Sequence, residues 1–351
     1  MIPDFKTYIR ESVWADLHSR GVGELEREED IITTREQLDE IIRSAYEEQG
    51  QGDTLTIDLT VKKIMVDDLS YLFSHYKNVK HILGLETWDV SNVKDMAHMF
   101  VNCANLTEVN ISNWDVSNVT NMKSMFANCV NLTTLNISNW DVGKVKDMNG
   151  MFYFCYNLTK LGIGGWNTSK VKDMSRMFNY CSGLTKLDIG NWNVRNVEDM
   201  GYMFNACKKL KKLNIENWDV SNVTNMSYMF GNCKNLTKLD IGGWNTNKVI
   251  RMDYMFDSCK NLTELNIGGW DVSQVVNMTA MFNDCEGLIE LNIGNWNTSN
   301  VTNMSYMFAV CKNLKDLHIE NWNVISIKKM TDMFYECPVK YMKKENKLIR
   351  I

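Results

Sequence analysis

Residues 218–244 read WDVSNVTNMSYMFGNCKNLTKLDIGGW, a stretch that runs from one tryptophan, Trp218, to the next, Trp244. Ten tryptophans keep this spacing without an insertion: Trp88, Trp114, Trp140, Trp166, Trp192, Trp218, Trp244, Trp270, Trp296 and Trp322. A Met-Phe dipeptide recurs ten times with the same step, and a cysteine follows each of its phenylalanines by three residues. A fixed period of this length indicates a repeat array in which each unit covers the next.

The apolar positions of one unit predict how a single coil folds. In the unit around Trp140 they are Leu132, Leu135, Ile137, Trp140, Val142, Val145, Met148, Met151, Phe152 and Cys155. The alternation at residues 135–137 predicts a short strand, and the spacing over residues 148–152 predicts a short helical turn. Parallel strands stacked roughly 4.8 Å apart would seal each coil against its neighbours. We therefore predict a β-rich α/β repeat solenoid, a leucine-rich-repeat-like stack of about ten 26-residue coils with short helical turns.

Polar residues around each tryptophan predict the turns. Asn or Gly precedes nine of the ten tryptophans, as at Gly165 and Gly243, and these residue types tolerate positive φ. Asp or Asn always follows the tryptophan and predicts an Asx turn. Asp or Asn also precedes the first methionine in eight units, where we expect an N-cap. Arg251 and Lys329 break this last rule, so we expect their turns to be the weakest.

The repeat resembles a known family. The order Met-Phe-x2-Cys-x2-Leu-x2-Leu-x-Ile-x2-Trp is similar to the BspA-type leucine-rich repeat, here Met229, Phe230, Cys233, Leu236, Leu239, Ile241 and Trp244. Segments such as WDVSNVTNM resemble a sub-family of tandem domains of unknown function in mycoplasma, Gram-positive and gut bacterial proteins. The resemblance covers about residues 85–337. It implies an adhesin-like surface protein that binds a partner, without identifying that partner.

The first residues depart from this family pattern. MIPDFKTYIRESVW has no apolar core or small-residue cleavage site of a secretory signal peptide. No stretch of the chain approaches a membrane span. The sequence therefore leaves a cytoplasmic or virion-associated location open, beside the cell surface that the resemblance implies.

The sequences before and after the repeats predict different structures for the two ends of the array. Residues 55–84 are expected to form a degenerate capping coil before the ten repeats of 85–337, because an end coil has one face without a neighbour. Residues 338–351 are expected to form a basic C-terminal cap or tail with a strand at Leu348. Residues 1–54 predict a helical segment: an apolar stripe from Phe5 to Leu17, then a capping box at Thr34 and Gln37 before a second helix. This segment either packs on the first coil or anchors the chain to another subunit or particle.

The repeated cysteines and tryptophans each have a structural and a functional interpretation. Stacked cysteines would lie within bridging distance, but we expect free thiols in core slots that need a small residue. No cysteine or histidine spacing suits zinc. The tryptophans could form an exposed strip for sugars or lipids, but we expect them in the core, because ten exposed rings would make a very large apolar patch.

Positions that vary between repeats are the better candidates for binding. One outward strand position changes sign along the chain, and two neighbouring acids flank it: Lys160, Lys186, Lys212, Lys238, Glu264, Glu290 and Asp316, with Asp188 and Asp240 beside them. We call these nine residues the strand-face strip. They form either a surface for an anionic or mixed-charge partner or an ordinary solvated sheet face.

A second candidate is a column of tyrosines on the predicted helical turns: Tyr202, Tyr228, Tyr254 and Tyr306. Tyrosine is a good contact residue because it combines a large ring with one polar handle. The alternative is that these rings shield the edges of the methionine layer.

Catalysis finds no support in the sequence, because nearly every polar residue is a copy with sisters along the array, whereas an active site needs a unique set of groups. No basic stretch suits a nucleic acid, and no cofactor motif is present. We therefore expect a non-enzymatic recognition or adhesion module for a protein or glycan partner. The alternative is a structural spacer or particle component, such as a phage-type fibre or assembly protein, anchored through residues 1–54.

Overall fold

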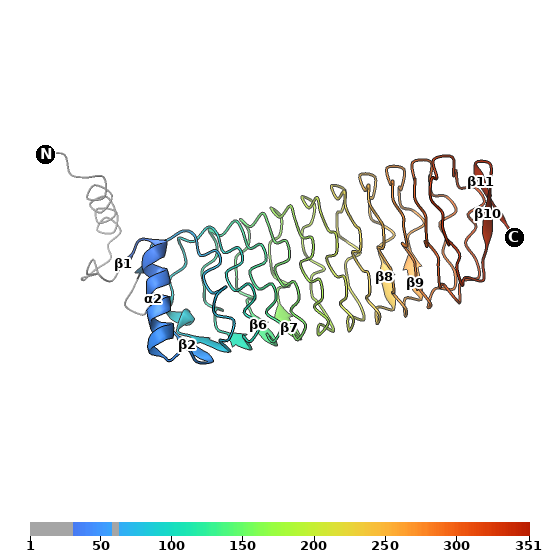
Figure 1. Cartoon of the computed structure of the whole chain (residues 1–351). Helices are drawn as coiled ribbons and strands as arrows, with labels where there is room; N and C mark the ends of the chain where they lie inside the picture. The colour runs from blue at the N-terminus through green and yellow to red at the C-terminus, as the bar shows by residue number, and fades with distance from the viewer. Residues whose placement is uncertain (1–30, 58–62) are drawn as a thin grey trace.

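The computed structural model describes residues 31–57 and 63–351, which form one elongated stack of coils. Helix α2 (Arg35–Glu48) closes one end and a β-hairpin closes the other (Figure 1). The first predicted helix, with its apolar stripe from Phe5 to Leu17, lies outside the described residues.

Short parallel strands stack along the axis with the 26-residue step of the sequence. In the repeats, Lys238 pairs with Glu264 and Thr134 with Lys160. The sheets are β1-β3, β2-β4-β5, β6-β7, β8-β9 and the antiparallel hairpin β10-β11. The strands are β1 Ile31–Ile32, β2 Thr54–Thr56, β3 Lys63–Ile64, β4 His81–Leu83, β5 Glu108–Val109, β6 Thr134–Asn136, β7 Lys160–Gly162, β8 Lys238–Asp240, β9 Glu264–Asn266, β10 Tyr341–Lys344 and β11 Lys347–Arg350. This arrangement confirms the predicted repeat solenoid.

The ten tryptophans lie inside the stack, as the sequence predicts. Trp218 is 3% exposed, and its ring stacks on that of Trp244 with 6.4 Å between centroids. Its indole Nε1 donates to the backbone oxygen of Ile189 in the preceding coil, at 3.1 Å. The tryptophan ladder therefore joins neighbouring coils through both ring packing and a buried hydrogen bond.

The ten cysteines are free and buried. The Cys207 thiol, for example, lies 3.2 Å from the backbone oxygen of Phe178, to which it donates. The cysteines thus occupy the core slots that the sequence assigns to them, as small groups with a weak hydrogen bond.

The segment around the two methionines of each repeat differs from the prediction, because it forms turns that are not helical. We call residues 252–258 and their equivalents in each coil the turn ridge. Two residues of the ridge in a coil, such as Tyr228 and Asn232, have positive φ, at 56° and 57°. The amides of these two residues donate to the backbone oxygens of Asp253 and Asp257 in the next coil. A helical turn would use such amides within its own coil and leave the neighbouring coil without partners.

The residues before the tryptophans also correct a prediction. Gly165 and Gly243 have no positive φ, which occurs instead along the turn ridge. The Asx turns after the tryptophans are confirmed, since Asp219 Oδ1 accepts from the amide of Ser221 at 3.1 Å.

The N-terminal end is closed by α2. Thr34 and Gln37 form the predicted capping box, and Leu38 and Ile42 of the helix are fully buried in the same core as the coils. A short 3-10 helix, η2 (Leu85–Thr87), lies immediately before Trp88, the first tryptophan of the repeats. The second helix of the N-terminal segment therefore packs on the first coil.

The C-terminal end is covered by the hairpin of β10 and β11. Leu348 is 1% exposed and Tyr341 is 5% exposed, so the hairpin buries apolar side chains against the last coil. The Tyr341 hydroxyl bonds Glu320 at 3.1 Å, and the amide of Val324 donates to the backbone oxygen of Asn346 at 3.0 Å. The strand predicted at Leu348 is confirmed as β11.

Candidate functional site: the strand face and the tyrosine column

The strand-face strip lies on the outer side of the short strands. Each strand alternates an outward and an inward residue, so Lys238 and Asp240 are exposed while Leu239 between them is buried. All nine strip residues are exposed except Asp316, which is half-buried. The period of two therefore places the predicted residues on one continuous face.

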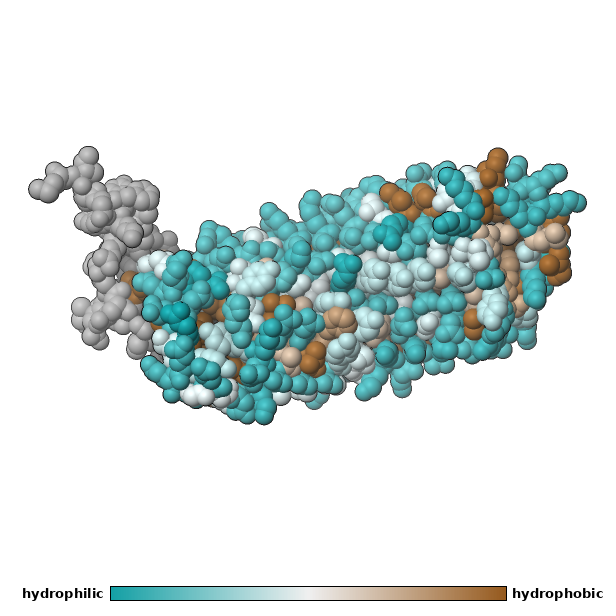
Figure 2. Space-filling model, in the orientation of Figure 1, coloured by the Kyte–Doolittle hydropathy of each residue, from teal (hydrophilic) through white to brown (hydrophobic). Residues whose placement is uncertain are grey.

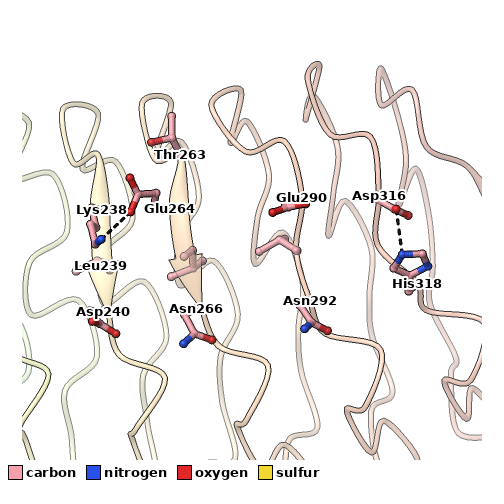
Figure 3. Close-up of a pocket in the computed structure, with 12 residues that line it drawn as sticks. Lys238, Leu239, Asp240, Thr263, Glu264, Asn266, Glu290, Asn292, Asp316 and His318 are labelled. Carbon is pink, nitrogen blue, oxygen red and sulfur yellow. Dashed lines mark ion pairs between the residues drawn. The ribbon is translucent and has the colours of Figure 1, made fainter.

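The C-terminal part of this face forms a hollow of about 660 Å³. We call it the acidic hollow, because the strip residues Asp240, Glu264, Glu290 and Asp316 line it together with Lys238. Figure 3 shows two rows of side chains across successive coils: Lys238, Glu264, Glu290 and Asp316 in one row, and Asp240, Asn266, Asn292 and His318 in the other.

Ion pairs neutralise only part of the acidic hollow. Lys238 Nζ lies 2.7 Å from Glu264 Oε2, and this hydrogen bond raises the pKa of the lysine (Figure 3). His318 Nε2 and Arg350 Nη1 approach Asp316 at 3.0 and 3.5 Å. Among the described residues no ion pair reaches Asp240 or Glu290. The acidic hollow therefore keeps free carboxylates.

The N-terminal part of the strip carries opposite charge. Lys160, Lys186 and Lys212 are exposed, and no ion pair within the described part of the chain neutralises them. Lys212 stands beside Lys238 in the next coil, so two ammonium groups adjoin where the sign changes. Asp188 also forms no ion pair with these lysines in the described region. The strip is thus a basic row followed by an acidic hollow.

Two residues that approach Asp316 escaped the sequence analysis. His318 stands two residues after Asp316, and the same strand period that selected Asp240 could have found it. Arg350 comes from β11, and nothing in the repeat pattern predicts that the hairpin brings it to Asp316.

The tyrosine column lies on the turn ridge. Tyr202, Tyr228 and Tyr254 stack face to face with centroids 4.5 and 4.4 Å apart. All three, and Tyr306, have positive φ. Burial and the neighbouring Tyr254 hydroxyl raise the pKa of Tyr228. Tyr306 stands apart from the stack and is 42% exposed.

The described residues contain neither a cluster typical of a metal site nor a helix that could span a membrane. No group of three or more His, Cys, Asp or Glu side chains that could hold a metal ion occurs in residues 31–57 and 63–351. Within the same residues, no helix has the length and apolar character needed to cross a membrane. In Figure 2 hydrophilic residues dominate the visible face, and hydrophobic residues form small separate groups.

Comparison with known proteins places the repeats in a family. The family model described as "Mycoplasma protein of unknown function, DUF285" matches residues 67–182, 154–265 and 255–344. No curated protein matches the chain.

Solved structures with similar architecture share little sequence. A leucine rich cell surface protein from Faecalibacterium prausnitzii is 16% identical, with a TM-score of 0.32 over 76% of this chain and 82% of that one. A leucine-rich repeat protein from Eubacterium ventriosum is 16% identical, with a TM-score of 0.29 over 80% and 92%. The complex of TLR13 with ssRNA13 gives 17% identity and a TM-score of 0.29, over 77% of this chain and 40% of that one. At these values the matches carry no argument about partner or activity.

Proposed function

This chain belongs to the family described as Mycoplasma protein of unknown function, DUF285, and from its geometry we propose a non-enzymatic recognition module whose strand face binds a protein or glycan partner. The observation that carries the proposal is the division of charge along the strand-face strip. Three unpaired lysines precede a hollow with free carboxylates, on a rigid face whose backbone is fixed by stacking. We propose that the partner is bound at a cell or virion surface, and the resemblance of the repeats supports the cell surface.

The length of the strip fits an extended partner better than a small molecule. The acidic hollow is shallow and polar, whereas sites for small ligands are usually concave and mostly apolar. Exposed charges on successive coils can instead steer a partner of complementary charge pattern and fix its register. A mixed-charge partner, with acidic groups over Lys160 to Lys212 and basic groups over Glu290 and Asp240, satisfies both halves.

A screen of the full chain against cell-surface protein and glycan arrays tests this proposal. The test variant carries Lys160→Glu, Lys186→Glu and Lys212→Glu. The matched control carries Lys208→Glu, Lys209→Glu and Lys234→Glu, which change the same net charge at exposed positions away from the strand face. We expect a partner that the parent and the control bind and that the strand-face variant loses at least tenfold.

A partner bound equally by all three proteins would exclude the strand face as the binding surface. If none of the three binds any surface component, the proposal fails and the structural spacer becomes the better explanation. Circular dichroism of each variant shows whether the solenoid is intact, because exposed lysine substitutions should leave the fold unchanged.

A further inference from the structure

The tyrosine column is interrupted at one coil. Its positions recur with the repeat period on the turn ridge, and Ala280 occupies the place between Tyr254 and Tyr306. Rings in adjacent coils stack with centroids 4.4 to 4.5 Å apart. Two coil steps therefore separate the Tyr254 and Tyr306 rings by roughly 9–10 Å, and no ring contact joins them within the described chain.

This interruption has the size of one flat group. A planar guest halfway between the two rings would lie at nearly the spacing that the column itself shows for stacked tyrosines. Ala280 is 2% exposed, so its short side chain is buried and places no group in the column at this coil. Tyr306 is 42% exposed, which leaves part of its ring available to a guest. We call this place the Ala280 gap, bounded by Tyr254, Ala280 and Tyr306.

The column already holds a guanidinium one step from its stacked tyrosines. Arg176 occupies the same position one repeat before Tyr202, and its Cζ lies 5.1 Å from the centre of that ring. Arg176 also has positive φ, at 58°. An arginine guanidinium thus substitutes for a ring in this column, held by cation–π attraction.

The carboxylate of Asp257, which forms no ion pair within the described residues, lies next to Asn283 of the coil that contains the Ala280 gap. A column tyrosine covers the residue three positions later, since a Cβ on Gly231 would lie 3.4 Å from Cδ1 of Tyr228. Asp257 and Asn283 are the equivalents of Gly231 in the next two repeats. We therefore infer that Tyr254 covers Asp257 and that a guest in the Ala280 gap would cover Asn283. Asn283 Nδ2 donates to Asp257 Oδ1 at 2.7 Å.

The charge of Asp257 is only partly compensated. Asp253 pairs with Arg251 at 3.0 Å and Asp284 with Lys260 at 3.1 Å, but no cation forms an ion pair with Asp257 among the described residues. Burial raises the pKa of Asp257, and its hydrogen bonds from Asn283 and Ser258 lower it. A cation in the Ala280 gap would stabilise the ionised carboxylate.

We propose that the Ala280 gap binds the guanidinium of an arginine side chain from a partner protein, stacked between Tyr254 and Tyr306 with Asp257 as counter-charge. Arginine fits better than lysine because its guanidinium is planar and stacks on both ring faces. It fits better than an uncharged ring because of Asp257. This inference rests on the proposed function only in taking a protein partner, and it uses residues outside the strand-face strip.

Nuclear magnetic resonance of the full chain, labelled with 13C in alanine methyl groups, tests the inference. The probes are acetyl-arginine amide, acetyl-lysine amide and acetyl-phenylalanine amide. We expect acetyl-arginine amide to shift the Ala280 and Ala309 methyl signals saturably, and the other two probes to bind about tenfold more weakly. Ala309 lies three residues after Tyr306. Its methyl signal reports probe binding in every variant, including those in which Ala280 is replaced.

Filling the Ala280 gap should abolish this response. Ala280→Arg and Ala280→Tyr place in the column residue types that Arg176 and Tyr228 already show there, so at least one of the two should fold normally. Asp257→Asn should weaken the arginine probe several-fold while the tyrosine stack remains. The strand-face variant with three glutamates should bind the arginine probe like the parent, which separates this site from the proposed function.

Equal binding of lysine and arginine probes, or a shift that survives in both filled variants, would overturn the inference. So would the absence of any shift at Ala280 in the parent. An unchanged affinity in Asp257→Asn would refute the part played by the carboxylate.

Discussion

Arg35 Nη1 donates a hydrogen bond to the backbone oxygen of Ser70 at 2.8 Å and lies 3.4 Å from that of Asp68. In the next coil the equivalent oxygens, on Asp95 and Ala97, accept amides from the coil before them. The guanidinium of α2 therefore supplies the donors that a preceding coil would supply. A stack of coils needs such a cap, because its first turn ridge otherwise exposes acceptors without partners.

We predict that Arg35→Ala lowers the free energy of unfolding by about 1–2 kcal/mol, since two backbone acceptors lose a charged donor. Arg43→Ala is the control, because Arg43 is exposed and its nearest carboxylate, on Glu40, is 3.8 Å away. That change should cost less than about 0.5 kcal/mol. Urea denaturation measures both, and hydrogen exchange at Tyr71 and Phe73 locates the loss. Equal midpoints for the two variants would show that Arg35 does not cap the stack.

The tryptophan ladder has one member without its hydrogen bond. Trp88 Nε1 is buried with no partner, whereas Trp218 Nε1 donates to Ile189. Replacing either tryptophan by phenylalanine removes a similar volume from the core, but Trp218→Phe also removes a buried hydrogen bond, which leaves the amide of Trp192 as the donor to the Ile189 oxygen. We expect Trp218→Phe to cost about 1 kcal/mol more than Trp88→Phe. Comparison of urea midpoints tests this, and a larger loss for Trp88→Phe would contradict the role given to the indole bond.

The 26-residue period predicts most of the fold, because identical spacing lets identical residues stack. It also predicts neighbours on the strand face, since Lys238 and Glu264 stand one repeat apart and form an ion pair. The turn ridge escapes this reasoning. Its methionines have helical spacing, but residues such as Tyr202 adopt positive φ, which a sequence pattern seldom reveals for tyrosine. The contact of Arg350 with Asp316 depends on a hairpin outside the repeat.

Two glycines of the solenoid should respond differently to an added methyl group. A Cβ on Gly183 would lie 2.7 Å from the backbone oxygen of Leu158 and 2.9 Å from that of Tyr156, whereas nothing lies within 4 Å of one on Gly165. We expect Gly183→Ala to cost about 1–3 kcal/mol through backbone crowding. Gly165→Ala should be neutral or stabilising by up to about 1 kcal/mol, because alanine reduces the freedom of the unfolded chain. Thermal unfolding distinguishes the two, and similar melting temperatures would rule out the crowding.

The buried cysteines should make stability fall at alkaline pH. Burial raises the pKa of the Cys207 thiol from 9.0 to about 12. The folded chain therefore keeps this proton while the unfolded chain releases it above pH 9, so stability is present below pH 9 and is lost as pH rises toward 12. Cys207→Ala removes one such titration. When the pH rises from 9 to 10, we therefore expect the free energy of unfolding to fall by about 1 kcal/mol less in this variant than in the parent. Urea denaturation at the two pH values gives this difference directly. Parallel losses in parent and variant would mean that the thiol titrates alike in both states, and that the cysteine column is open to solvent.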